Sequence, residues 1–127
     1  MDRKQKFFLC ESCGNMVGVI DDGGVPLVCC GDDMTELVPN SVEASGEKHL
    51  PDVSVSGDTV NVQVGSVAHP MEDDHYISFI YLETECGGQR KALNPGNAPK
   101  ASFALFDDKA IAVYAYCNLH GLWVTEI

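Results

Sequence analysis

Short runs in which apolar and polar residues alternate fill most of the chain after residue 51. They are centred on Val53/Val55, Val60/Val62/Val64, Ile77/Phe79/Tyr81, Phe103/Leu105 and Ile111/Val113. Clusters of Gly, Asn, Pro and Asp separate these runs, which is typical of tight turns. The pattern predicts an all-β fold of roughly five to seven short strands, arranged as an immunoglobulin-like antiparallel β-sandwich. No stretch has the period of a substantial helix.

Residues 1–37 differ in character from the rest of the chain. They contain four of the six cysteines and none of the four histidines, all of which lie beyond residue 48. Short apolar runs around a Gly-rich turn at 21–24 predict small strands. A segment of fewer than about 40 residues seldom buries enough surface to fold unaided, so we expect a metal-dependent module. The predicted organisation is this small module over 1–37, followed by the β-sandwich domain over 38–127.

Composition narrows the classes of function. Of the 127 residues, 45% are hydrophobic and 21% are charged, as in ordinary globular proteins. The formal charge of −11 disfavours binding to the phosphate backbone of nucleic acids. No apolar run approaches the ~18 residues of a membrane-spanning helix, and Phe7-Phe8-Leu9 is too short for a signal-peptide core. We therefore expect a cytoplasmic protein without membrane or nucleic-acid partners, whose six cysteines serve metal or redox chemistry.

The cysteines of the small module form two pairs, Cys10-x-x-Cys13 and the adjacent Cys29-Cys30. The first pair can place both sulfurs on one side of a tight turn, and the second can complete a tetrahedral set of four thiolates. Zinc and iron both accept that set, and a pair of disulfides is a further alternative. Adjacent cysteines strain such a site, because neighbouring side chains diverge in extended backbone. Gly31 directly follows the pair and can relieve that strain.

A second group of metal-binding residue types is spread over the larger domain. Its members are His49, His69, His75, Cys117 and His120. Each histidine stands beside a predicted strand end or loop, where irregular backbone lets side chains converge. Four imidazoles and one thiolate are five donors, whereas zinc prefers four. An iron ion with one position left open fits this set better.

In their order along the chain, these motifs resemble the desulfoferrodoxin family, the two-iron form of superoxide reductase. The resemblance covers essentially the whole chain and rests on Cys10-x-x-Cys13, Cys29-Cys30, Glu47-Lys48-His49, His69-Pro70-Met71 with His75, and Cys117-Asn118-Leu119-His120-Gly121. It implies one desulforedoxin-like iron on Cys10, Cys13, Cys29 and Cys30. It implies a second, catalytic iron with His49, His69, His75 and His120 in its equatorial plane and Cys117 axial. Lys48 is implied to act at the open face, and Glu47 to occupy the sixth position in the ferric state.

The function implied by this resemblance is the one-electron reduction of superoxide to hydrogen peroxide, without evolution of oxygen. Re-reduction by rubredoxin or a similar small redox protein, and a homodimer, are implied in the same way. The four-cysteine iron either relays electrons or only folds its module. Two other functions stay open at this point: a rubredoxin-like electron carrier without catalysis, and a zinc-stabilised binding module.

Three further expectations concern residues near these motifs. Cys86 fits neither ligand set and is predicted to be a free thiol in or near a turn. The backbone amides of Leu119 and His120 are expected to tune the Cys117 thiolate, following the general role of groups that contact metal ligands. Trp123 is expected to pack around the second site.

Overall fold

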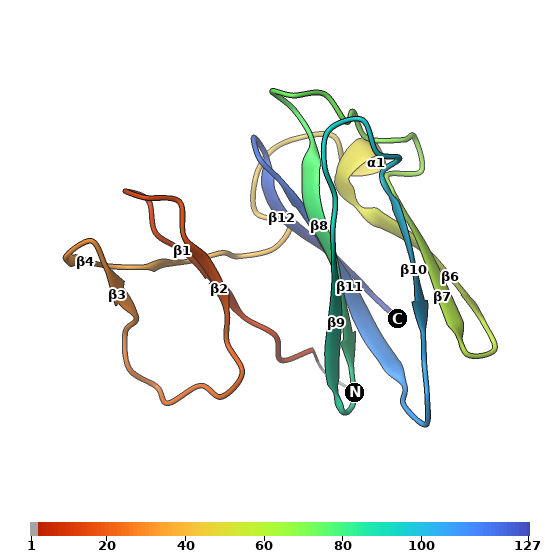
Figure 1. Ribbon diagram of the computed structural model, residues 1–127, viewed down its shortest axis with the longest axis horizontal. Helices are drawn as coiled ribbons and strands as arrows, with labels where there is room; N and C mark the ends of the chain where they lie inside the picture. Colours follow the sequence, from red (N-terminus) through yellow and green to blue (C-terminus); the bar gives the residue numbers. More distant parts are fainter. Residues whose placement is uncertain (1–2) are drawn as a thin grey trace. The chain divides into compact units, whose positions relative to one another are not determined.

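The computed structural model describes residues 3–127, which divide into two compact units (Figure 1). One unit is Lys4–Val38, and the other comprises Arg3 and Pro39–Ile127. Within residues 3–127, no helix is both long enough and apolar enough to cross a membrane.

The Lys4–Val38 unit consists of two small sheets with little apolar interior. Three antiparallel strands lie in the order β2-β1-β5, with bounds β1 (Phe7–Leu9), β2 (Met16–Gly18) and β5 (Thr35–Glu36). The strands β3 (Val28–Cys29) and β4 (Asp32–Asp33) form a separate hairpin. Phe7 and Cys10 are the buried hydrophobic residues of this unit. Two buried hydrophobic residues are too few to stabilise a unit of this size. The fold of this unit therefore depends on a metal bound by its cysteines.

The larger unit is a sandwich of two antiparallel sheets. One has the order β10-β7-β6, with bounds β6 (Pro51–Ser56), β7 (Thr59–Val64) and β10 (Lys100–Ala104). The other has the order β12-β11-β8-β9, with bounds β8 (Ile77–Thr84), β9 (Gly87–Ala92), β11 (Ala110–Cys117) and β12 (Gly121–Glu126). Side chains of both sheets, among them Val62, Phe103, Ile80 and Val113, form one core. The predicted all-β class, with a cysteine module before a β-sandwich, is confirmed.

The strand β9 begins where the sequence pattern indicates a turn, at Gly87-Gly88. Its residues show no apolar alternation because β9 is an edge strand and nearly all of its side chains are exposed. Gly88 lies so close to the ring of Tyr81 that an added methyl group would collide with that ring. Gly88 is therefore a strand residue that leaves room for the ring of Tyr81, and the chain turns two residues earlier than expected, at 85–86.

Strand pairing gathers the segments that carry the second group of donors at one end of each sheet. Pro51, the first residue of β6, pairs with Val64, the last residue of β7. Cys117, the last residue of β11, pairs with Gly121 of β12 and with Ile77, the first residue of β8. A single helical turn, α1 (Gly46–His49), directly precedes β6.

Candidate metal centres

Cys29 and Cys30 lie at the tip of the β3–β4 hairpin. Cys29 pairs with Asp32, so Cys30 and Gly31 form a two-residue turn. Both turn residues have positive φ, 53° at Cys30 and 81° at Gly31, as a type I′ turn requires. The sulfurs of Cys29 and Cys30 lie 4.0 Å apart despite being neighbours in sequence. The strain of adjacent ligands is therefore carried by Cys30 itself as well as by Gly31.

Cys10 and Cys13 come from the tight turn that follows β1. The Gly14 amide donates to the Cys10 carbonyl at 2.9 Å, and the Cys10 amide donates to the Asn15 carbonyl at 2.8 Å. The Cys13 amide donates to the sulfur of Cys10 at 3.5 Å. This amide is the main reason why the pKa of the Cys10 thiol is lowered to about 6. The turn thus favours a thiolate, which is the form that binds a metal.

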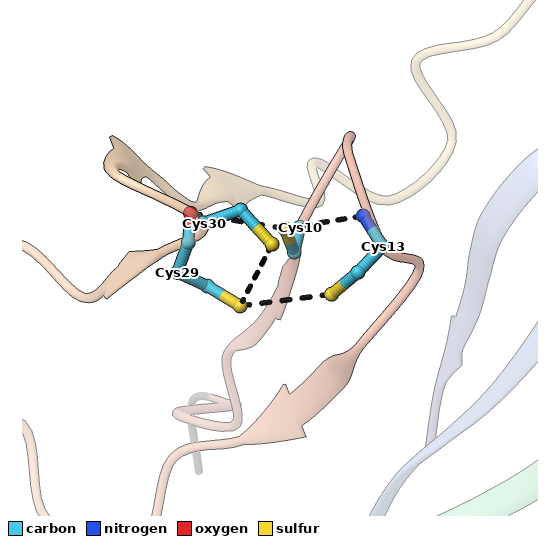
Figure 2. Close-up of side chains that lie close together, drawn as sticks. All are labelled: Cys10, Cys13, Cys29 and Cys30. Carbon is cyan, nitrogen blue, oxygen red and sulfur yellow. Dashed lines mark hydrogen bonds between the residues drawn. The ribbon is translucent and has the colours of Figure 1, made fainter.

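The four sulfurs of the small unit surround a common centre (Figure 2). All lie within 4.8 Å of one another, with 3.6 Å between the sulfurs of Cys13 and Cys29. Four thiolates around an ion at about 2.3 Å would be about 3.8 Å apart. Neighbouring sulfurs, first that of Cys13, raise the pKa of Cys30 to about 12, so full ionisation of the set needs a bound cation. Because all four cysteines are free thiols, the geometry favours a tetrahedral metal site over two disulfides.

The four histidines of the larger unit enclose a square. Neighbouring ring centroids are 4.7 Å apart for His49–His69 and His69–His75, 5.2 Å for His75–His120 and 4.9 Å for His120–His49. The His49–His75 distance is longer, 6.4 Å, and is a diagonal. All pairs of rings in a tetrahedral site would be about equally far apart. The arrangement therefore matches four ligands in one plane.

The nitrogens of His49 and His69 that face each other both carry lone pairs. Nδ1–H of His49 donates to the Ser45 carbonyl, and Nδ1–H of His69 donates to the Pro70 carbonyl, each at 2.7 Å. Since a carbonyl only accepts, Nε2 of each neutral ring is left without a proton. These two Nε2 atoms are nonetheless 3.2 Å apart. Lone pairs at that distance repel each other unless a cation lies between them.

Three further observations fit a cation in the square. Burial lowers the pKa of His69 to about 4 and also lowers that of His49, so both rings are neutral at pH 7. Nε2 of His75 is buried and, within residues 3–127, has no hydrogen-bond partner. Nε2 of His49 lies 3.1 Å from Nδ1 of His120. Nitrogens at right angles around an ion at about 2.1 Å would be about 3.0 Å apart.

Cys117 supplies a fifth donor. Its side chain is fully buried, and its sulfur lies 3.9 Å from Nδ1 of His120. The sulfur is also within 4.8 Å of one ring nitrogen of each of the other three histidines. Burial raises the pKa of the Cys117 thiol, and the amides of Leu119 and His120 act in the opposite direction, as expected from the sequence. The structure therefore brings all five predicted donors of the larger unit together.

Asn118 holds two of the donor segments together, a role that the motif alone did not indicate. Its side chain accepts a hydrogen bond from the Tyr76 amide at 2.9 Å and donates one to the Asp74 carbonyl at 3.0 Å. Its own amide donates to the Tyr76 carbonyl at 3.2 Å. These bonds fasten the segment of His75 to the turn that follows Cys117. The one signal in the sequence is that Asn118 stands directly after a ligand.

The other residues singled out in the sequence lie in simple surroundings. Trp123 stacks on His49 with ring centroids 5.0 Å apart and donates from Nε1 to the His120 carbonyl at 3.1 Å, so its predicted packing role is confirmed. Glu47 and Lys48 are exposed on α1, next to buried His49. Cys86 is an exposed free thiol in a turn, outside both donor groups, as predicted.

Two protein-family models match this chain, and each matched region contains one of the two donor groups. A family model described as "Desulfoferrodoxin, N-terminal domain" matches residues 2–37, and one described as "Desulfoferrodoxin" matches residues 41–126. The desulfoferrodoxin of Syntrophotalea carbinolica is 45% identical over 126 residues, 99% of each chain.

Two solved structures are similar in fold. The superoxide reductase from Treponema pallidum has a TM-score of 0.82 and 39% identity, covering 98% of this chain and 100% of that one. The superoxide reductase (1Fe-SOR) from Giardia intestinalis has a TM-score of 0.55 and 35% identity, covering 64% of this chain and 97% of that one. The first match spans both units, and the second spans about two thirds of this chain.

Replacing Cys13 by Ala is expected to lower the metal content from two ions per chain to one, because one corner of the four-sulfur group is lost. The Lys4–Val38 unit should then become sensitive to protease, since its apolar burial does not hold it folded. Elemental analysis and limited proteolysis measure both effects. Cys86→Ala removes an exposed thiol outside the groups and is the matched control, expected to keep both ions. Two ions in the Cys13→Ala protein would contradict the site.

Proposed function

This chain belongs to the desulfoferrodoxin family, and on that premise we propose that it is a superoxide reductase. It combines superoxide with one electron and two protons to form hydrogen peroxide, and it evolves no oxygen. The observation that carries the proposal is the square of four imidazoles with a buried thiolate beside it. The similar structures from Treponema pallidum and Giardia intestinalis, both named superoxide reductase, support it.

Each donor group holds one iron ion, so the chain carries two. The module over 1–37 is proposed to bind the first through Cys10, Cys13, Cys29 and Cys30, and the domain over 38–127 to bind the second through His49, His69, His75, His120 and Cys117. When bound, the second iron supplies the electron and a vacant position for the anion. Four nitrogens in a plane suit iron better than zinc, which closes a tetrahedron with four ligands.

Cys117 determines which side of the square is left for the substrate. Its sulfur lies 3.9 Å from Nδ1 of His120 and within 4.8 Å of a ring nitrogen of each other histidine, so we assign the sulfur to one side of the square and the anion to the opposite side. If iron is bound, the Cys117 thiolate would be one of its donors and would supply electron density that favours loss of an electron from the ion. Complete burial keeps this sulfur away from water and oxidants.

Lys48 is exposed and directly precedes the ligand His49, in a chain whose formal charge is −11. Mobile ions screen charges beyond about 8 Å at physiological salt, so a lysine next to His49 outweighs acidic groups farther away. We assign its ammonium group the roles of attracting superoxide and ordering the water that delivers protons. The carboxylate of the neighbouring Glu47 is assigned the position that the product leaves.

Each turnover uses one electron from outside the protein. We propose rubredoxin or a similar small redox protein as its donor, and the cytoplasm as its location, because the six cysteines are free thiols of the kind that a reducing compartment preserves. A rubredoxin-like electron carrier without catalysis is the second candidate function. It is favoured by the four-sulfur group, but it gives the square of histidines no role.

The reaction type is tested by following superoxide, hydrogen peroxide and oxygen together, with reduced protein in excess. One peroxide is expected for each superoxide consumed, with no oxygen released. His120→Ala should abolish this consumption, because it removes one corner of the square, and should leave the spectrum of the four-sulfur iron unchanged. Return of half the consumed superoxide as oxygen would show dismutation, and full activity in His120→Ala would leave the electron carrier as the better candidate.

Lys48→Ala is expected to slow the reaction with superoxide about tenfold at low ionic strength and less at high salt, because a nearby attracting charge is lost. Stopped-flow measurement over a salt series gives this difference. Lys109→Ala is the matched control, since Lys109 is exposed and precedes β11, whose far end carries Cys117. Equal rates for Lys48→Ala and the unaltered chain at low salt would contradict the role of Lys48.

We further propose a homodimer in which the Lys4–Val38 units of two copies meet. This unit exposes many aliphatic side chains, namely Val17, Ile20, Val25, Leu27, Val28 and Val38. So many exposed aliphatic side chains in so small a unit are typical of a surface that is covered by a protein partner. Ile20→Asp with Val25→Asp should give a monomer in sedimentation experiments, whereas Phe106→Asp, at a similarly exposed position of the larger unit, should leave the dimer intact. A monomeric unaltered chain would contradict this assembly.

A further inference from the structure

The turn over 65–67 fastens the backbone that carries Glu47 and Lys48. The Val67 amide donates to the Glu47 carbonyl at 3.2 Å, and the Gly65 amide donates to the Leu50 carbonyl at 3.1 Å. The Ser66 hydroxyl adds a third bond, to the Glu47 carbonyl at 3.3 Å. The two segments are therefore joined by hydrogen bonds on both sides of His49.

Gly65 makes this close approach possible because it has no side chain. It is buried, and its φ is +81°, a backbone conformation that residues with a Cβ rarely adopt. A Cβ at this position would collide with the Val67 carbonyl oxygen, and it would lie 2.7 Å from the Lys48 carbonyl oxygen and 2.8 Å from the Lys48 carbonyl carbon. All three atoms are backbone, so they cannot swing away as a side chain would. Any other residue at position 65 has to displace both the peptide group between Lys48 and His49 and the Val67 carbonyl of its own turn, so it opens the contact between the two segments.

The α1 turn needs such support because it does not hold its own shape. It has four residues, and its N-cap residue Ser45 makes no side-chain capping bond. So short a helix is unstable in isolation. Glu47 and Lys48 are both exposed, so few neighbouring side chains restrict them. The position of the α1 backbone therefore determines which region their side chains can reach. Contacts from outside the helix fix that backbone, and the 65–67 turn supplies two hydrogen bonds to Glu47 of α1 and one to Leu50, which directly follows α1.

We propose that Gly65 is a positioning residue that holds Lys48 at the vacant face of the histidine square by letting the 65–67 turn close on the Lys48 peptide. The inference rests on the proposed function, because Lys48 must matter for the capture of superoxide. It adds a residue that touches neither the ion nor the substrate. It also links Lys48 to His69, which follows in the same loop and whose amide donates to the Val64 carbonyl at 3.0 Å.

The test is a double-mutant cycle with Gly65→Ala and Lys48→Ala, measured as the rate of reaction with superoxide at low ionic strength. Gly57→Ala is the matched control: Gly57 also has positive φ, +58°, but its added methyl group would meet nothing within 4 Å. The control carries the backbone strain of the substitution without the collision. Iron content and the visible spectrum are recorded for every variant.

Gly65→Ala is expected to slow the reaction roughly tenfold, about as much as Lys48→Ala, with both irons bound and the spectrum preserved. The double variant should be no slower than Lys48→Ala alone, because the two substitutions remove the same interaction. Gly57→Ala should react at the unaltered rate. A residue that only stabilised the fold would instead lower the rate by the same factor in both backgrounds.

Several results would overturn the inference. A normal rate in Gly65→Ala alongside a slowed Lys48→Ala overturns it and leaves the proposed role of Lys48 standing. Additive losses, or loss of the second iron in Gly65→Ala, overturn it because Gly65 then acts on the fold or on His49. An unchanged rate in Lys48→Ala overturns the role of Lys48 and this inference with it.

Ser66→Gly keeps the proposal testable if Gly65→Ala does not fold. Ser66 is exposed, so this variant retains the fold while it removes the hydroxyl bond to Glu47 and loosens the turn. A roughly threefold slower reaction is expected, and the same substitution in the Lys48→Ala background should change nothing. An equal loss in both backgrounds, or no loss in either, would count against the proposal.

Discussion

Five donor atoms from separate segments share one ion only if the strands that carry them are locked in register. Cys117 illustrates this constraint, because side chains alternate between the two faces of a strand. Along β11, Tyr116 pairs with Phe79, yet Cys117 pairs with Ile77, so Ser78 of β8 is left as an extra residue. Such an irregularity turns the side chain beside it and is common next to functional sites. The direction of the Cys117 side chain is thus determined by the pairing of β8 with β11, which are far apart in sequence.

The two centres reach their geometry by different routes. In the small unit, a type I′ turn and a tight turn after β1 place four sulfurs with almost no apolar core beneath them. In the larger unit, the strands pack around one apolar core, and the segments at one end of the sheets present the imidazoles. Hydrogen bonds from Nδ1 of His49 and His69 to backbone carbonyls fix which nitrogen faces the ion. The four-sulfur centre is needed to stabilise the small unit, whereas the apolar core of the larger unit positions the histidines and Cys117.

Residue types and their spacing identified the composition of both centres, whereas the planar shape of the second was implied only by the family resemblance. The five donors of the larger unit were recognisable because His and Cys are scarce and stand at strand boundaries. The square arrangement of the rings was implied only by the family resemblance, and residue types and spacing did not predict it, since it depends on the tautomers of His49 and His69 and on strand register. The edge strand β9 was missed because exposed residues carry no alternation, and Gly88 looked like a turn residue although it accommodates Tyr81.

The sequence also did not predict the residues that act through contacts with the backbone. Asn118 and Gly65 contribute hydrogen bonds or empty space, neither of which leaves a periodic or spaced pattern. Cys30 was expected to need help from Gly31, but the left-handed conformation extends over both residues, because a type I′ turn requires positive φ at each. The residue type identifies a possible metal ligand, whereas the contacts that orient its side chain can be identified only in the folded structure.

The unequal exposure of the sulfurs has a consequence for a protein that works beside reactive oxygen species. Cys13 and Cys30 are exposed, whereas the Cys117 side chain is completely enclosed. Oxidation of thiolates to sulfinic or sulfonic acids follows their accessibility. Oxidative damage should therefore begin at the exposed cysteines of the small module. The protein should lose the iron of that module before it loses the iron held by Cys117.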